Sequence, residues 1–507
     1  MTNKRGGRKS HMTIISSVKE FSARYPDYHA VIDSHQTLTY RELDSYSSNW
    51  ARFLAESGIQ PGAKVMICLR NSSVFVAILL ALEKLNTMII PLNYHTPSQE
   101  VEQLADEYGI SLLITEEFFR NRFSDVSMDV LYKEEVRLEK TAGAGSLDQE
   151  DEGSLESGEM LFFTSGSTGK PKGIVVKKSN IAPAILPDMA KERQSRHFIV
   201  RPIFFRSHLT LAYGTLLQCD TLILSEDDSP GEIYRLITEH EVTQITSGPT
   251  DLQQLVDYME ENSLNIPSSL AEIMSTGRAL SAELRRKLPA LAPHATVIDF
   301  YGTSEAGPIT SIDHCEWNEK AGSSGLPEYF IQLRIMDEDG RELEAGEIGE
   351  VSIKSGQIMN EYYNDPLLTD QTFHGEFLRS GDLGYLDEDG YLYLVGRSKE
   401  VINKGGYNFY CSEIEDAFLQ IEEVKQAAVI PVADKKWGQV PAAFLKLQGA
   451  NHPEEVCETI RQALLTRLAE YKCPEYFTIV ADIPVNLGGK VDKKSLERLL
   501  SQEISVG

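Results

Sequence analysis

The chain contains the sequence Leu161-Phe-Phe-Thr-Ser-Gly-Ser-Thr-Gly-Lys-Pro-Lys-Gly-Ile-Val-Val176, in which hydroxyls, glycines and two lysines lie between two apolar runs. The apolar runs predict two strands. Glycine lets the backbone N–H groups of the loop approach an anion closely, and the hydroxyls and lysines add donors and positive charge. The loop is therefore suited to a polyphosphate, although a glycine- and serine-rich turn by itself is often only a flexible hairpin.

The residue after Lys170 distinguishes this loop from the P-loop of the common nucleotidases. A P-loop continues from its lysine through Ser or Thr into a helix, whereas Pro171 follows here. Proline disfavours the helical conformation of the residue before it. We therefore expect the chain to return directly into a strand over Gly173–Val176.

Thr164–Gly173 resembles the phosphate-binding signature of the adenylate-forming superfamily, which includes acyl-CoA synthetases, peptide-synthetase adenylation domains and firefly luciferase. Further stretches resemble signatures of that superfamily and follow in the same order: Tyr301-Gly-Thr-Ser-Glu305, Ser380-Gly-Asp382, Gly396-Arg397-Ser-Lys399 and Gly488-Gly-Lys490. The superfamily usually has Thr where this chain has Ser304, so the hydroxyl is kept.

Length and charge limit the kind of protein further. A chain of 507 residues exceeds what one hydrophobic core usually serves, so we expect two or more domains. The net charge of −27 opposes binding to nucleic acid or to an anionic membrane. The cysteines show neither paired metal spacing nor the density of a disulfide scaffold, which fits a reducing compartment. With no visible signal peptide or membrane span, we expect a cytoplasmic monomer or homodimer and interpret residues 1–11 as a tag or a disordered arm.

The alternation of apolar and amphipathic segments predicts the fold class. From Val65 onward it follows a βαβ rhythm, which implies parallel sheets covered by helices. We predict an α/β fold: a large N-terminal domain of two α/β subdomains and a small β subdomain, then a small α+β C-terminal domain. The predicted boundaries are 12–396 for the N-terminal domain and 400–505 for the C-terminal domain. The resemblance implies that the C-terminal domain is mobile, with a hinge at 397–399. The predicted elements include the helices Ser98–Tyr108, Leu209–Gln218, Ala282–Leu291 and Pro453–Tyr471 and the strands Phe198–Phe204, Glu272–Ser275 and Thr296–Phe300.

The resemblance implies roles for residues at the end of the strand Thr296–Phe300, where open α/β folds bind ligands. Tyr301 would stack on adenine, Asp299 would meet the adenine amino group, and Ser304 would hold the α-phosphate. Glu305 would bind Mg²⁺, a hard cation that takes one or two carboxylates together with phosphate oxygens. Taken alone, this stretch reads as a strand end followed by a turn.

The resemblance also implies roles late in the chain. Asp382 would accept both ribose hydroxyls and Arg397 would complete the clamp. Lys490 would bridge the substrate carboxylate and the α-phosphate, and Lys399 occupies the hinge position. Gly405 and Gly406 would line a channel for the thiol. The alternative interpretations are a common turn for Asp382, a solvated surface charge for Lys490 and a charged loop residue for Lys399.

The residues implied for the substrates form two sets. The set for ATP or AMP is Thr164, Ser165, Gly166, Ser167, Thr168, Gly169, Lys170, Lys172, Gly277, Arg278, Asp299, Tyr301, Gly302, Asp382 and Arg397, with Lys490, Glu305 and Ser304 as the catalytic residues. The set for the acyl pocket is Phe205, Arg206, His208 and Phe300.

Arg206 bears on the kind of acid. It lies where amino-acid-activating relatives usually hold an aspartate that pairs with the α-amino group, and an arginine repels an ammonium. We therefore expect a non-amino acid, an aliphatic or aryl monoacid first and a diacid second, with Arg206 available for the second carboxylate. The alternative is that Arg206 turns outward or closes an ion pair.

The implied reaction has two steps. A carboxylate and MgATP give an acyl-adenylate and pyrophosphate, and the thiol of coenzyme A then gives acyl-CoA and AMP. No general base is needed for the first step, because the carboxylate is already the nucleophile. Two alternatives remain open from the sequence: a stand-alone enzyme that loads an acid or amino acid onto the phosphopantetheine of a carrier protein, and a non-catalytic nucleotide-binding homologue.

Overall fold

The computed structural model describes residues 13–138, 158–164, 171–181, 194–448, 453–474, 476–485 and 491–504. They form two compact units. The first holds the described chain up to Gln332 together with Lys354–Phe373, and the second holds Leu333–Ile353 and the chain from His374 onward. The chain thus leaves the first unit, returns to it for one segment and leaves it again. The hinge at 397–399 stays a prediction, because a division into compact units does not test whether the units move.

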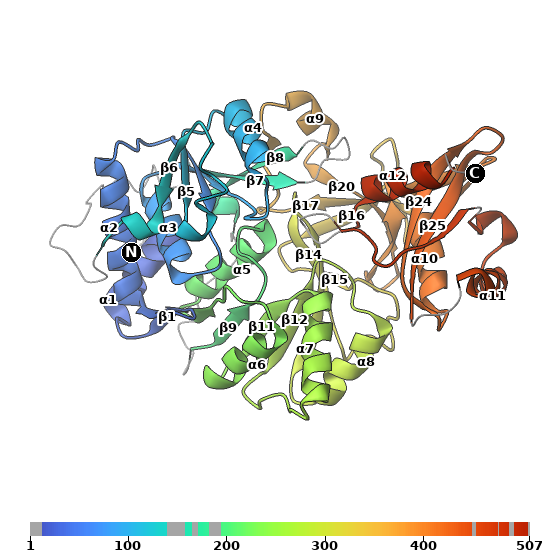
Figure 1. Cartoon of the computed structure of the whole chain (residues 1–507), viewed down its shortest axis with the longest axis horizontal. Helices are drawn as coiled ribbons and strands as arrows, with labels where there is room; N and C mark the ends of the chain where they lie inside the picture. Colours follow the sequence, from blue (N-terminus) through green and yellow to red (C-terminus); the bar gives the residue numbers. More distant parts are fainter. Residues whose placement is uncertain are drawn as a thin grey trace, which may run out of the picture. The chain divides into compact units, whose positions relative to one another are not determined.

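A nine-stranded sheet forms one half of the first unit (Figure 1). In spatial order its strands are β15 (Leu326–Pro327), β14 (Gly307–Asp313), β13 (Thr296–Thr303), β12 (Glu272–Thr276), β11 (Gln244–Ser247), β9 (Arg196–Ile199), β10 (Thr221–Ile223), β1 (His29–Ile32) and β2 (Thr37–Thr39). The strands from β13 to β1 in this order are parallel. Their carboxyl ends therefore meet at one edge, which is where such sheets bind ligands.

Helices cover both faces of this sheet. The helices α6 (Pro230–Glu239), α7 (Pro249–Glu261) and α8 (Ala282–Leu291) lie on one face and share a hydrophobic core with the strands. Proline at the first turn of α6 and α7 fits a position whose N–H has no partner within the helix. On the other side, α5 (Arg206–Leu217) contacts β9 and β10.

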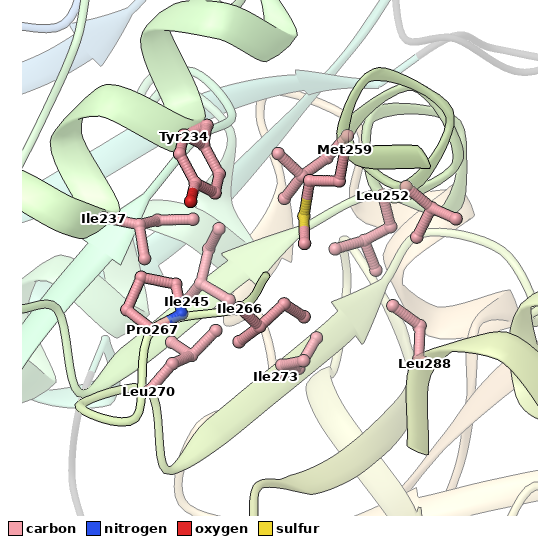
Figure 2. Close-up of a pocket in the computed structure, with 12 residues that line it drawn as sticks. Tyr234, Ile237, Ile245, Leu252, Met259, Ile266, Pro267, Leu270, Ile273 and Leu288 are labelled. Atoms are coloured by element: carbon pink, nitrogen blue, oxygen red, sulfur yellow. The ribbon is translucent and has the colours of Figure 1, made fainter. Parts of the chain in front are cut away.

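A small cavity lies between α6, α7, α8 and the sheet, and Figure 2 shows the side chains around it. Its lining is Tyr234, Ile237, Ile245, Leu252, Leu255, Val256, Met259, Ile266, Pro267, Leu270, Ile273 and Leu288. These side chains are almost entirely apolar, and the Tyr234 hydroxyl donates to the main-chain oxygen of Asn265 at 3.0 Å. We interpret the cavity as a packing gap in the core, because it offers no polar groups for a charged substrate.

A seven-stranded sheet forms the other half of the first unit. In spatial order its strands are β18 (Glu361–Tyr362), β8 (Lys172–Lys177), β7 (Glu159–Thr164), β4 (Met88–Pro91), β3 (Lys64–Cys68), β5 (Leu112–Thr115) and β6 (Asp129–Tyr132). The helix α4 (Ser98–Tyr108) packs its apolar stripe on one face. The helices α1 (Ile14–Arg24), α2 (Tyr40–Glu56) and α3 (Ser73–Lys84) contact one another, α1 contacts α5, and α3 contacts β4, so these helices link the two sheets.

The second unit contains two smaller sheets. The first has the order β16 (Gln332–Met336), β17 (Gly349–Lys354), β20 (Phe377–Leu386) and β19 (Phe373–His374), with β21 (Leu392–Arg397) also on β20. The second has the order β23 (Tyr407–Tyr410), β22 (Val401–Lys404), β25 (Gly438–Leu447) and β24 (Val424–Asp434), with β26 (Tyr476–Ile479) also on β25. The helices α10 (Cys411–Leu419), α11 (Pro453–Leu465) and α12 (Lys493–Ile504) belong to the C-terminal part.

The predicted fold class is confirmed, and several element bounds agree. The helices α4 and α8 have the bounds that the sequence predicts. The predicted strand Phe198–Phe204 is wrong beyond Ile199, where β9 ends. The chain then turns, and the Phe205 N–H donates to the Pro202 oxygen at 3.3 Å. The predicted helix Pro453–Tyr471 ends early, at Leu465. No helix in the described part of the chain is long and apolar enough to cross a membrane.

Candidate active site

The predicted adenine-binding residues lie at the carboxyl edge of the nine-stranded sheet. In the parallel pairing of β12 with β13, Ser275 lies beside Asp299 and Thr276 beside Phe300. Gly277 and Arg278 follow β12 directly, and Gly277 has a φ of +95°, which glycine adopts without strain. The structure therefore brings together the segment after β12 and the end of β13, as the sequence predicts.

The two carboxylate oxygens of Asp299 differ in their hydrogen bonds. Its Oδ2 accepts from the Leu280 N–H at 3.1 Å and from Arg285 Nη2 at 3.3 Å. Its Oδ1 is buried and has no partner among the described residues. Burial raises the pKa of Asp299, although Leu280, Arg285 and the neighbouring Ser275 hydroxyl oppose the shift. An orphaned buried acceptor suits a donor from a ligand, such as the amino group of a base.

The turn after β13 is shaped by close backbone contact. A Cβ on Gly302 would lie 2.4 Å from the main-chain oxygen of Gly307, so only glycine fits there. The hairpin of β13 with β14 then carries Ser304 and Glu305 at its end. Tyr301, Ser304 and Glu305 are all half-buried.

Glu305 is held through both its main chain and its side chain. Its main-chain oxygen accepts from the Met359 N–H at 2.7 Å, and its Oε1 accepts from the Tyr362 hydroxyl at 3.2 Å. Within the described chain, Oε2 has no hydrogen-bond partner. A carboxylate with one oxygen fixed and one open fits a hard cation such as Mg²⁺.

Arg206 is the first residue of α5 and is buried. Its Nη1 donates to the main-chain oxygen of Ser304 and its Nη2 to that of Gln357, while its Nε has no partner in the described part of the chain. Burial lowers the pKa of Arg206 to about 10, and the negative charge of Glu305 opposes the shift only in part, so the side chain is charged at neutral pH. Arg206 thus does not turn outward and forms no ion pair with a described residue, and each terminal nitrogen of its guanidinium donates to a main-chain oxygen.

The other predicted acyl-pocket residues lie nearby in sequence and in the sheet. His208 is buried, and both of its ring nitrogens are without a partner among the residues described. Burial lowers the pKa of His208 to about 3, with the charges of Arg201 and His197 adding to the shift, so the ring is neutral at pH 7. The Phe205 ring centre lies 5.9 Å from that of His208, and Phe300 is half-buried in β13.

The predicted phosphate loop joins an antiparallel pair of strands. Thr164 at the end of β7 pairs with Lys172 at the start of β8. The chain does return into a strand after the loop, as Pro171 predicts. The Lys172 Nζ lies 5.5 Å from the ring centre of Tyr362. The residues Ser165, Gly166, Ser167, Thr168, Gly169 and Lys170 lie outside the described residues.

In the second unit, the structure brings together the predicted ribose-binding pair. Asp382 on β20 lies opposite Arg397 on β21, and Arg397 Nε is 2.9 Å from Asp382 Oδ1. Asp382 is buried and Arg397 is half-exposed. A further hairpin joins β22 to β23 through Gly405 and Gly406, whose φ values of +60° and +90° are typical of a two-residue turn.

The roles of Lys399 and Lys490 in the second unit stay predictions. Lys399 is exposed in a short 3₁₀ helix, Ser398–Glu400. Lys490 and the glycines before it lie outside the described residues. The ends of their segment are close together, because Val485 and Val491 form an antiparallel bridge.

Tyr362 is the residue that the sequence analysis missed. It lies 57 residues after Glu305 along the chain, in a strand of only two residues. Neither periodicity nor spacing marks such a contact in advance, because it depends on how β18 adds to the edge of the seven-stranded sheet.

Comparison with known proteins identifies the family. The chain matches the model for the AMP-binding enzyme over residues 18–363 and the model for the AMP-binding enzyme C-terminal domain over residues 413–490. The chain belongs to the AMP-binding enzyme family. The family that the motifs predicted is thereby confirmed.

Several curated relatives align over nearly the whole chain. The chain is 30% identical to 2-succinylbenzoate–CoA ligase of Bacillus velezensis over 492 residues, covering 95% of this chain and 97% of the relative. It is 28% identical to feruloyl-CoA synthase of an Amycolatopsis species over 490 residues, covering 93% and 96%.

Among solved structures, o-succinylbenzoate CoA synthetase (MenE) of Bacillus subtilis in complex with ATP and magnesium ion has a TM-score of 0.83 and 27% identity, covering 95% of this chain and 99% of that one. The same enzyme with its acyl-adenylate intermediate also has a TM-score of 0.83 at 27% identity, covering 95% and 97%. Both agree with the predicted architecture.

Proposed function

We propose that this protein is an AMP-forming acyl-CoA ligase. It activates a carboxylic acid with MgATP to an acyl-adenylate, releases pyrophosphate, and transfers the acyl group to coenzyme A. The observation that carries the proposal is the pair of half-open carboxylates, Asp299 and Glu305, at the carboxyl edge of one sheet. The predicted enzyme class, which uses ATP, Mg²⁺ and coenzyme A, is confirmed by relatives named as a CoA ligase and a CoA synthase and by the related structure with ATP and magnesium ion.

The residues would divide the work of the first step as follows. Asp299 Oδ1 accepts from the adenine amino group, and Tyr301 stacks on the ring. Glu305 would hold Mg²⁺, which would neutralise charge on the phosphates. Lys490, together with Lys170 and Lys172, adds positive charge at the reacting phosphate. Catalysis rests on positioning and charge neutralisation, because the attacking carboxylate needs no base.

Residues of the second unit and of the β13 turn have further proposed roles. Asp382 accepts from the ribose hydroxyls, with Arg397 as its partner, and the Ser304 hydroxyl contacts the α-phosphate. Lys399 acts as the pivot between the adenylating and thiolating arrangements. The turn of Gly405 and Gly406 then lines the thiol channel.

For the acid, we propose a non-amino monocarboxylic acid, aryl or aliphatic, with a diacid as the second class. Arg206 is buried and charged, so an α-ammonium close to it would be repelled. Its two terminal nitrogens each donate one hydrogen bond to a main-chain oxygen, and the guanidinium keeps three further N–H groups, so a diacid stays as the second class. The names of the relatives, a succinylbenzoate ligase and a feruloyl-CoA synthase, support the aryl class.

The test is acid-dependent exchange of pyrophosphate into ATP over a panel of aryl acids, aliphatic monoacids, diacids and free α-amino acids. We expect exchange with a simple carboxylate and little with any α-amino acid. An α-amino acid that exceeds every simple carboxylate would overturn the assignment of the acid. Nucleotide binding without exchange for any acid would instead indicate a non-catalytic homologue.

The acceptor is tested in the second step. We expect the acyl-adenylate to be consumed by free coenzyme A and to give acyl-CoA. A carrier protein bearing phosphopantetheine is the second candidate, because its arm ends in the same thiol. Consumption by the carrier alone would overturn the CoA assignment while leaving the adenylation step intact.

We also propose that the protein works in the cytoplasm as a monomer or homodimer. All six cysteines are free thiols in the structure, which supports a reducing compartment. Light scattering on the purified protein measures the oligomeric state, and cell fractionation measures the location.

A further inference from the structure

The segment from Gln357 to Tyr363 connects Glu305, the proposed magnesium ligand, to β8, the strand that follows the phosphate loop. On one side, the Met359 N–H donates to the main-chain oxygen of Glu305 at 2.7 Å. On the other, the Asn360 N–H donates to the Val175 oxygen at 2.8 Å and the Tyr363 N–H to the Gly173 oxygen at 2.9 Å. Both Val175 and Gly173 belong to β8. The segment therefore spans from the end of one sheet of the first unit to the edge of the other.

Tyr362 lies at the centre of this segment and contacts both sides with its side chain. Its hydroxyl donates to Glu305 Oε1 at 3.2 Å, and the face of its ring lies 5.5 Å from Lys172 Nζ, within the range of a cation–π contact. The residue is buried and its backbone is paired with Ile174 of β8, so the ring has little freedom to move.

The hydrogen bond between Tyr362 and Glu305 has a fixed direction. An ionised carboxylate can only accept hydrogen bonds, so the Tyr362 hydroxyl is the donor. One oxygen of Glu305 is occupied by a protein donor, and the other remains for a cation.

We propose that Tyr362 is a positioning residue for the magnesium site, a role that rests on the proposed function of Glu305. The hydroxyl fixes Oε1 and so limits rotation of the carboxylate, and Glu305 in this orientation would bind the cation through Oε2. Its ring at the same time contacts Lys172, a predicted phosphate ligand. Outer partners of this kind typically change metal affinity or activity about 10–100-fold when they are removed.

The test compares Tyr362→Phe with Tyr363→Phe. Both substitutions remove one tyrosine hydroxyl from neighbouring residues of the same segment. The Tyr363 hydroxyl accepts from Lys64 Nζ at 2.5 Å and does not contact Glu305, so this variant is a matched control for the loss of a hydroxyl in the fold. The first measurement is the affinity of the protein for Mn²⁺ in the presence of a non-hydrolysable ATP analogue, monitored by electron paramagnetic resonance. The second and third are the affinities of the protein for that analogue in Mg²⁺ and in EDTA.

We expect Tyr362→Phe to weaken metal binding about 10–100-fold, to lower the affinity for the analogue in Mg²⁺ and to leave the affinity in EDTA unchanged. Tyr363→Phe should match the wild type in all three measurements. Equal metal affinities for the two variants, or a loss of analogue affinity in EDTA for Tyr362→Phe, would overturn the positioning role. A wild-type protein without metal-dependent pyrophosphate exchange would overturn the proposed function instead.

Discussion

Arg206 is buried and charged, and main-chain oxygens accept its hydrogen bonds. Its two terminal nitrogens join the turn that holds Ser304 to the segment that begins at Gln357. Removing the guanidinium would leave both carbonyls without a donor, and each unsatisfied buried group costs about 1–3 kcal/mol. The side chain thus stabilises the same turn that presents Glu305.

We expect Arg206→Met to lower the free energy of unfolding by about 2–4 kcal/mol, because two buried acceptors lose their donors. Arg206→Lys, which can donate to only one of the two carbonyls at a time, should lose roughly half as much. Urea unfolding of the three proteins measures the difference. A methionine variant as stable as the wild type would show that the two carbonyls find other donors.

Buried histidines make the fold sensitive to acid. Burial lowers the pKa of His208 to about 3 and that of His197 to about 4, both below the value of about 6.5 for an unfolded chain. Above pH 6.5 both states are neutral and these groups do not affect stability. As the pH falls below 6.5, the unfolded chain binds protons that the folded chain does not, so stability decreases.

At pH 5 this proton linkage of His208 should lower the free energy of unfolding by about 2 kcal/mol. We expect the difference in unfolding free energy between His208→Gln and the wild type to shift by that amount in favour of the variant between pH 8 and pH 5. Urea titrations at the two pH values measure it, with His314→Gln, at a half-buried site, as the control. Curves for His208→Gln and the wild type that stay parallel over this range would contradict a buried neutral ring.

At the scale of the elements, an ion-pair network connects the two sheets of the first unit. Glu116 follows β5 and is buried, and it accepts from Arg70 Nε at 2.8 Å and from Lys133 Nζ at 2.7 Å. Arg70 Nη1 also lies 2.9 Å from Glu226, which follows β10 of the other sheet. Burial alone would raise the pKa of Glu116, but the bonds from Arg70 and Lys133 outweigh it and lower the pKa.

Glu116→Gln should lower the free energy of unfolding by about 3 kcal/mol, because the two cations lose a buried counter-charge. Since the folded pKa of Glu116 lies below its unfolded value, this contribution is present at neutral pH and is lost as the pH falls through the acidic range. The deficit of the variant should therefore shrink in acid. Thermal unfolding at pH 7 and pH 4 tests this. A loss of stability that is the same at both pH values would show that the charge of Glu116 is not its cause.

The elements also show what could be read from the sequence. The helices α4 and α8 were predictable to the residue, because their apolar stripes are bounded by Gly109 and by the Ser281 cap. The boundary between β9 and α5 was not, because Ile203, Phe204 and Phe205 continue an apolar run through a turn. The place of the turn after β13 was predictable from its motif, while the roles of Ser304 and Glu305 stay predictions. The pairing of Glu305 with Tyr362 was not, because it depends on a two-residue strand at a sheet edge.

At the scale of the whole molecule, the two steps of the reaction should depend on different residues. Lys490→Ala should slow acyl-adenylate formation about 10²–10³-fold, because one positive charge at the first transition state is lost. Thiolysis of a preformed adenylate should change much less. Single-turnover assays of each half-reaction separate the two, and equal losses would show that Lys490 does not act in the first step alone.

The path of the chain through its two units has a consequence for recombination between related genes. Lys354–Phe373 returns to the first unit after the chain has already entered the second. A hybrid that switches parents after Phe373 inherits Glu305 and Tyr362 together, whereas a switch within Leu333–Ile353 takes them from different parents. Among active clones of a shuffled library, crossovers should therefore be depleted between Glu305 and Tyr362. This holds although Leu333–Ile353, which lies within that interval, belongs to the second unit.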